Sequence, residues 1–261
     1  MSTGSTATGV ALVTGASSGI GASFGRRLAA DGFDLVIVAR RADRLEALAE
    51  ELRGSGAEVE VLVADLASDA GLKSVEARLE SEQRLTLLVN NAGFAHFGSF
   101  MDEGAEKAEA GLRVLALATV RLTRAALPNL LSSGSGAVIN VSSRAAFGAN
   151  PKLATYSAAK AYVNRFTLAL ADELEGQGVR FLAVCPGNVE TELFEVAGID
   201  PAAMRGCLSP EQVVSESLEA LANGRRVCVP GERRRDRFLR AALPHGLVRK
   251  LASFLGRLAG A

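Results

Sequence analysis

The chain has 261 residues, and 48% of them are hydrophobic, which is enough to bury a large core. Lys and Arg together number 29, as do Asp and Glu, so no overall charge favours a nucleic-acid partner. The three cysteines and two isolated histidines form no metal-ligand pattern, and no metal site is expected. Because no signal peptide is evident and no apolar run approaches the roughly 20 residues that span a bilayer, the sequence predicts a cytoplasmic protein.

Short β-branched runs alternate along the chain with longer helical segments. Strands are predicted at 10–14, 34–39, 58–64, 86–89, 137–141, 180–184 and 227–229, and helices near 20–31, 42–53, 68–82, 103–132, 153–175 and 210–222. Several strands are continuously apolar, as from Leu35 to Val38, which is typical of a parallel sheet covered on both faces. The pattern predicts one α/β domain over residues 1–230, a doubly wound Rossmann sheet of seven parallel strands flanked by helices. Residues 190–209 lack periodicity and are predicted to form a substrate loop at the carboxyl edge of the sheet.

A glycine-rich segment joins the first predicted strand to the first helix. Its pattern is G-x-x-x-G-x-G, and glycine there permits a tight turn and a close approach of the backbone to a pyrophosphate. At the first βα junction this pattern favours nucleotide binding over an ordinary glycine-rich turn. The residues predicted to hold the nucleotide are Gly15, Ser17, Ser18, Gly19, Ile20 and Gly21.

The end of the second predicted strand indicates which nicotinamide cofactor is used. An NAD-binding protein places an acid there to hold the ribose 2′-hydroxyl, whereas this chain has Ala39 followed by Arg40 and Arg41. No carboxylate is expected there to repel a 2′-phosphate, and guanidinium groups can pair with one. The sequence therefore favours NADP(H), and the alternative is a pair of surface arginines that open a helix.

Tyr156 and Lys160 are four residues apart on a predicted helix and therefore share one face. An ammonium group favours a phenolate, so Lys160 is expected to lower the pKa of Tyr156 toward neutrality. This would make Tyr156 a proton donor and acceptor. The spacing alone is weak evidence, because such pairs are usually solvated.

Taken together, these motifs resemble the classical branch of the short-chain dehydrogenase/reductase family, from about residue 8 to residue 230. The resemblance extends to motifs after four further strands, and Ser143 precedes Tyr156 by the family's usual thirteen residues. It implies cofactor contacts from Tyr156 and Lys160 as well as from Asp65, Leu66, Asn91, Ala92, Gly93, Pro186, Gly187, Val189 and Thr191.

The resemblance also implies a mechanism. Hydride passes between nicotinamide C4 and a carbonyl carbon while Tyr156 gives or takes the proton on oxygen, and Ser143 donates a hydrogen bond to that oxygen. One position departs from the family, because its helical asparagine, thirteen residues before the proline at Pro128, falls on Leu115. Leucine cannot hydrogen-bond a relay water, so another proton route, slow turnover or a changed chemistry is expected.

The expected substrate-lining residues are mostly apolar. They are Phe94, His96, Phe97 and residues 144–147 and 194–208. This composition favours a lipophilic or aromatic ketone. The predicted function is an NADPH-dependent ketone reductase, assembled as a homodimer or homotetramer through the helix of Tyr156. An NADP-binding regulatory protein and a non-redox biosynthetic enzyme on the same fold are the alternatives.

Residues 231–261 are predicted to be a basic amphipathic extension packed on the same domain or on a dimer mate. From residue 233 to the end there are eight Lys or Arg residues and one acid, Asp236. A second interpretation is that this extension binds an anionic surface or a carrier protein.

Overall fold

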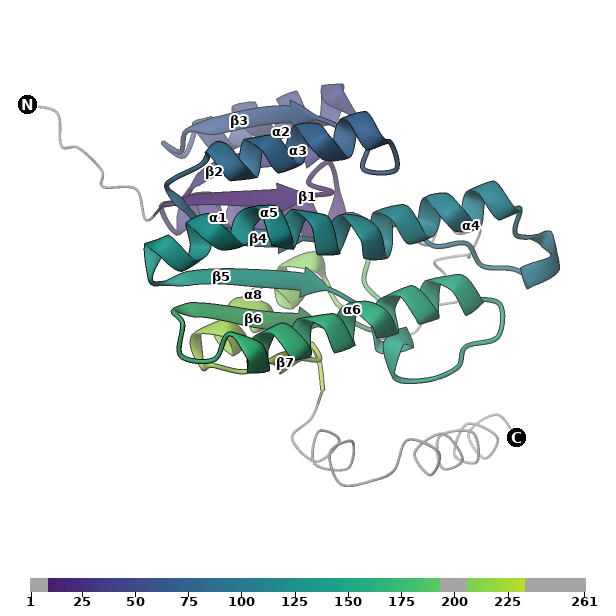
Figure 1. Cartoon of the computed structure of the whole chain (residues 1–261). Coiled ribbons are helices and arrows are strands. Elements are labelled where there is room, and N and C mark those ends of the chain that lie inside the picture. The colour runs from purple at the N-terminus through teal and green to yellow at the C-terminus, as the bar shows by residue number, and fades with distance from the viewer. Residues whose placement is uncertain (1–8, 193–205, 233–261) are drawn as a thin grey trace, which may run out of the picture.

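The computed structural model describes residues 9–192 and 206–232, so most of the expected substrate loop and residues 233–261 of the basic extension lie outside the described residues. One parallel sheet has the strand order β3-β2-β1-β4-β5-β6-β7 (Figure 1). This confirms the predicted doubly wound sheet of seven strands. The strands are β1 (Val10–Thr14), β2 (Asp34–Ala39), β3 (Val59–Val63), β4 (Leu85–Asn90), β5 (Gly136–Val141), β6 (Val179–Val184) and β7 (Val227–Cys228).

Helices cover both faces of the sheet. Those over one face are α1 (Gly19–Ala30), α2 (Ala42–Arg53) and α8 (Pro210–Ala222), and those over the other are α3 (Asp69–Ser81), α5 (Ala118–Ser133) and α6 (Ala154–Glu173). Shorter helical segments are η1 (Phe100–Asp102), α4 (Ala105–Leu112), η2 (Arg113–Leu117) and η3 (Arg144–Phe147).

The two helical layers explain why strands such as β1 and β2 have long continuous apolar runs. In β1, Ala11 and Val13 pack into the core under α1, α2 and α8, whereas Val10 and Leu12 pack into the core under α3 and α5. Successive strand residues point to opposite faces, so a sheet covered on both sides needs apolar side chains throughout. The edge strand β3 is more exposed, and its Val63 is a solvent-facing side chain.

Segments α4, η2 and α5 form one helical run, Ala105–Ser133, of 29 residues. By length and composition this run could cross a membrane, with a mean hydropathy of 1.3 in its most apolar stretch. Half of that stretch is buried, and the run packs against α3, β4 and α6. Core helices meet the same criterion, so the run is weak evidence for a membrane span.

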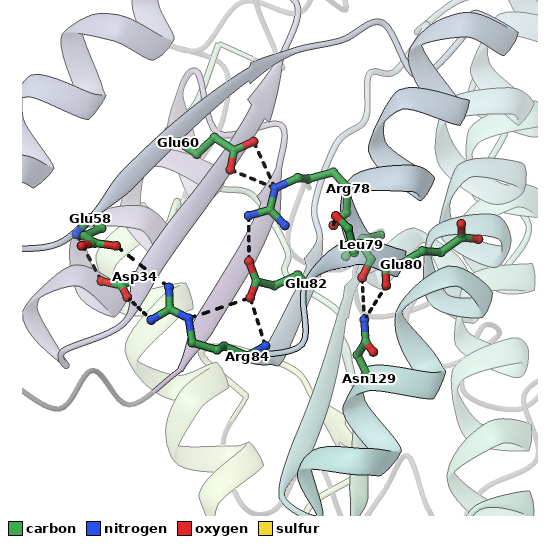
Figure 2. A network of polar contacts seen from close by, with 10 residues as sticks. Asp34, Glu58, Glu60, Arg78, Leu79, Glu80, Glu82, Arg84 and Asn129 are labelled. Atoms are coloured by element: carbon green, nitrogen blue, oxygen red, sulfur yellow. Dashed lines mark hydrogen bonds and ion pairs between the residues drawn. The ribbon is translucent and has the colours of Figure 1, made fainter.

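A network of ion pairs connects the end of α3 to the adjoining strands (Figure 2). Arg78 donates to Glu60 on β3 at 2.8 Å and to Glu82 at 2.7 Å, and Arg84 donates to Asp34 at 2.9 Å. Asp34 begins β2 and Arg84 immediately precedes β4. These two residues lie at the amino ends of their strands, away from the carboxyl ends that carry the predicted site.

Candidate active site

The carboxyl ends of the strands surround a cavity of about 290 Å³. Every residue predicted to bind the cofactor or to act in catalysis lines this cavity, with the exception of Gly21. Because the strands are parallel, the turns that follow them meet at one edge of the sheet. Motifs spread from residue 15 to residue 191 are thereby brought around one space.

The glycine turn after β1 is shaped to admit an anion. Gly15 and Gly19 have φ angles of +66° and +54°, in the left-handed region that favours glycine. A Cβ atom on Gly15 would lie 2.7 Å from the Cα of Ala92, and one on Gly19 would lie 2.8 Å from Cγ2 of Thr191. Ser18 makes no side-chain capping hydrogen bond to α1, which leaves backbone N–H groups at the helix start for a phosphate. These features fit a dinucleotide pyrophosphate.

Gly21 supports the turn from inside α1. A Cβ atom at this position would lie 2.2 Å from the carbonyl oxygen of Gly15. The glycine therefore lets the turn fold back closely on the helix, and its part in the site is to maintain the shape of the turn.

Ser143, Tyr156 and Lys160 meet at the cavity. Nζ of Lys160 lies 5.8 Å from the centroid of the Tyr156 ring and donates to the carbonyl oxygen of Val141 at 2.7 Å. Ser143 caps η3, where its Oγ accepts from the backbone N–H of Ala145 at 3.1 Å, and its side chain hydrogen-bonds that of Tyr156. The end of β5 and helix α6 thus bring the three side chains together.

Burial governs the ionisation of this group. It raises the pKa of Tyr156, an effect that the hydrogen bond with Ser143 partly offsets. Burial also lowers the pKa of Lys160 to about 8. The expectation that Lys160 brings the pKa of Tyr156 down is therefore wrong for the free protein. The ammonium group is itself desolvated and is directed to the carbonyl of Val141.

Leu115 lies beside the lysine, as part of a π-helical turn. It is 2% exposed. A Cβ atom on Gly93 would lie 2.8 Å from Cδ2 of Leu115 and 3.7 Å from Nζ of Lys160, so the leucine packs next to the turn after β4. An apolar side chain thus occupies the space near the lysine where the resemblance implies an asparagine.

The two arginines after β2 both line the cavity, but an acid lies with them. Arg41 donates to the hydroxyls of Ser17 and Ser18, each at 2.8 Å, and its Nη1 donates to Oε2 of Glu192 at 2.8 Å. The expectation that no carboxylate lies at this position is wrong. Glu192 is 151 residues from Arg41, so no local pattern around the second strand could have indicated it.

On the substrate side, Phe94 lines the cavity and Phe97 is partly exposed beneath the ammonium of Lys152, at 5.6 Å. Nδ1 of His96 lies 3.0 Å from Nζ of Lys107. Within 9–192 and 206–232, no cluster of three His, Cys, Asp or Glu side chains could hold a metal ion.

Comparison with known proteins agrees with this fold. The family model described as short chain dehydrogenase matches residues 9–201. A short chain dehydrogenase of Pseudocercospora fijiensis is 38% identical over 190 residues, which make up 70% of this chain and 60% of that protein. The chain therefore belongs to the short-chain dehydrogenase family and is an oxidoreductase of that family.

Two solved structures extend the similarity over nearly the whole chain. A short-chain dehydrogenase from Sphingobium yanoikuyae in complex with NADPH is 36% identical, with a TM-score of 0.86 and coverage of 94% of this chain and 95% of that one. A bulky-bulky ketone specific alcohol dehydrogenase from Comamonas testosteroni is 27% identical, with a TM-score of 0.81 and coverage of 96% and 95%.

Proposed function

We propose that this protein is an NADPH-dependent reductase of a lipophilic or aromatic ketone, and that it oxidises the corresponding alcohol in reverse. The observation that carries the proposal is the convergence of Ser143, Tyr156 and Lys160 on a cavity that Arg40 and Arg41 also line. The similar Sphingobium protein is described with NADPH, and the similar Comamonas enzyme is described as specific for bulky-bulky ketones. The first description supports NADPH as the cofactor, and the second supports a bulky ketone as the substrate.

The chain offers a binding group for each part of the cofactor. NADPH, when bound, supplies the hydride. The glycine turn and the start of α1 would hold the pyrophosphate, and Arg40 and Arg41 the 2′-phosphate. Asp65 and Leu66, after β3, would contact the adenosine, and Lys160 would hold the nicotinamide ribose.

Ser143 and Tyr156 would act on the carbonyl oxygen of the substrate. The Ser143 hydroxyl would donate a hydrogen bond to the carbonyl oxygen and stabilise the negative charge that develops there. Tyr156 would transfer its phenolic proton to the same oxygen as the carbon accepts the hydride. Because burial raises the pKa of Tyr156, the tyrosine carries this proton at neutral pH, as reduction requires. The resulting phenolate would regain a proton from solvent before the next turnover.

Replacing Tyr156 tests this assignment. We expect Tyr156→Phe to bind NADPH as the parent does and to lose at least about 10²-fold in kcat, the low end for loss of a general acid. Turnover is measured as the loss of NADPH absorbance with a panel of bulky aromatic ketones, and binding is measured by titration. Tyr162→Phe is the matched control, because it removes the hydroxyl of an exposed tyrosine on the same helix. Near-normal turnover by Tyr156→Phe would contradict the assignment.

An NADP-binding protein with weakened turnover is the second candidate. It is favoured by Leu115, which places a side chain without hydrogen-bonding capacity next to Lys160. A parent protein that binds NADPH tightly and reduces no ketone of the panel would support this candidate over the reductase.

A further inference from the structure

The carboxylate of Glu192 pairs with the guanidinium group of Arg41, the residue proposed to hold the 2′-phosphate. It accepts from Nη1 of Arg41 at 2.8 Å and also pairs with Nη1 of Arg44. The other nitrogens of the Arg41 fork donate to Ser17 and Ser18. Arg41 and Glu192 both line the cavity, whereas Arg44 is not among the lining residues. A phosphate that approaches Arg41 therefore meets a guanidinium group in which each of the three nitrogens already donates a hydrogen bond.

Glu192 is ionised at any physiological pH. The hydrogen bonds from Arg41 and Arg44 lower the pKa of its carboxyl group to about 2. Its side chain is 37% exposed, so water screens the pairs in part and the carboxylate can exchange partners. The site thus contains a carboxylate that stays negatively charged and that comes from a segment far along the chain.

This charge acts in opposite ways on the two nicotinamide cofactors. A 2′-phosphate is an anion that needs the same N–H groups of Arg41 and is repelled by the carboxylate. The 2′-hydroxyl of NADH is a hydrogen-bond donor, and a carboxylate accepts from it in many NAD-binding proteins. The usual acid of those proteins ends the second strand, where this chain has Ala39 and Arg40.

We infer that Glu192 is a specificity-determining residue that competes with the 2′-phosphate for Arg41 and narrows the preference for NADPH over NADH. In the NADPH-bound state Arg44 retains the displaced carboxylate, so that Arg41 is released to the phosphate. With NADH the carboxylate stays between the two arginines and accepts from the ribose 2′-hydroxyl. This inference rests on the proposed function only in requiring that the cavity bind NADP(H).

Neutralising Glu192 tests the competition. Dissociation constants for NADPH and NADH are measured at fixed low salt from nicotinamide fluorescence, since the chain contains no Trp. For Glu192→Gln we expect the ratio of the two constants to move toward NADPH by roughly tenfold, the order expected from removing one partly solvated charge contact. High salt should reduce this shift.

Glu190→Gln is the matched control. Glu190 is exposed, lies two residues away and forms no ion pair with any residue in the described ranges. Its neutralisation should leave the ratio within about twofold of the parent, because an exposed charge that does not line the cavity is largely screened. A Glu192→Gln ratio equal to that of this control overturns the inference and leaves the proposed function standing. A parent that binds neither dinucleotide overturns both.

Arg44 provides an independent test. We expect Arg44→Gln to weaken NADPH binding in the parent. Without Arg44, the carboxylate of Glu192 has only Arg41 as an ion-pair partner and competes more strongly with the 2′-phosphate for it. In the Glu192→Gln background the same change should have a much smaller effect, since there is no carboxylate left to retain. Equal effects in the two backgrounds would mean that Arg44 acts on the phosphate by its charge alone, and would overturn the role assigned to it.

Discussion

At the scale of single residues, desolvation decides the charge state of the candidate site. Lys160 is 4% exposed, and burial lowers its pKa to about 8 although it donates to the carbonyl of Val141. The pKa of Tyr156 shifts in the opposite direction. Burial raises it because the protonated form of tyrosine is neutral and the deprotonated form is charged. The free protein therefore holds a neutral tyrosine beside a lysine that loses its proton in mildly alkaline solution.

The lowered pKa of Lys160 predicts a pH-dependent stability. Unfolded lysine keeps its proton up to about pH 10.5, whereas the folded protein releases it near pH 8. Between these values the unfolded state binds more protons, so this group makes the free energy of unfolding rise with pH, by up to about 1.4 kcal/mol per unit. Below pH 8 both states are protonated and the contribution is constant.

The measurement compares the parent with Lys160→Met by chemical denaturation at several pH values. The parent's free energy of unfolding minus that of the variant should be level below pH 8 and rise from pH 8 to pH 10. Other titrating groups, such as Cys228, are common to both proteins and cancel in the difference. A difference that stays level through pH 10 would show that Lys160 is not desolvated in solution.

At the scale of elements, the π-helical turn η2 carries Leu115 at the position where the resemblance implies an asparagine. Turns of this type are rare and often lie at functional sites. Here the turn directs Leu115 toward Gly93 and Lys160, and Oγ1 of Thr119 donates to the carbonyl oxygen of Leu115 at 3.1 Å. The leucine contributes packing beneath the site and provides no hydrogen bond for a water that could serve the lysine.

The substitution Leu115→Asn distinguishes an effect of this position on stability from an effect on proton delivery to the site. The buried amide should lower the free energy of unfolding by about 1–3 kcal/mol if it stays unpaired. If proton delivery limits the parent, the solvent isotope effect on its turnover should exceed the effect of deuterating NADPH, and the variant should show a smaller solvent effect. Leu122→Asn, at a buried position on α5, should lose stability without changing either isotope effect. A full NADPH deuterium effect with no solvent effect in the parent would leave Leu115 with a packing role alone.

At the scale of the whole molecule, apolar side chains remain exposed on neighbouring helical segments. Leu112 on α4, Leu117 on η2 and Tyr162 on α6 are 44%, 41% and 50% exposed. Tyr162 stacks on Phe166, whereas the adjacent Val163 faces the interior of the protomer and is buried. Helix α6 is therefore apolar on two sides, and the side with Tyr162 faces out of the protomer.

We expect these side chains to pair copies of the chain as a homodimer or homotetramer. Sedimentation at micromolar concentration should show an oligomer, and Leu117→Glu or Tyr162→Glu should shift it toward the monomer because a charge would be buried at the interface. Val63→Glu is the control, since Val63 is 52% exposed and lies on the edge strand β3. A parent that sediments as a monomer would contradict the prediction.

Much of the fold and the outline of the site follow from local patterns in the sequence. The apolar runs and their alternation with helical segments predicted the seven strands within one or two residues of the observed bounds. Apart from the Tyr156 and Lys160 pair on α6, each motif directly follows a strand, and parallel strands place their carboxyl ends at one edge of the sheet. Local order along the chain was therefore sufficient to place Gly15, Ser143 and Tyr156 around the same cavity.

Tertiary structure decided the electrostatics of that cavity. A pKa depends on burial and on every charge nearby, so the spacing of Tyr156 and Lys160 could not reveal that desolvation outweighs their attraction. In the same way, the residues around Arg41 in the sequence contain no sign of Glu192, because β2 and the segment after β6 meet only when the whole sheet has formed. Periodicity and turn chemistry are encoded locally, whereas the charges that share a site are set by contacts between distant parts of the chain.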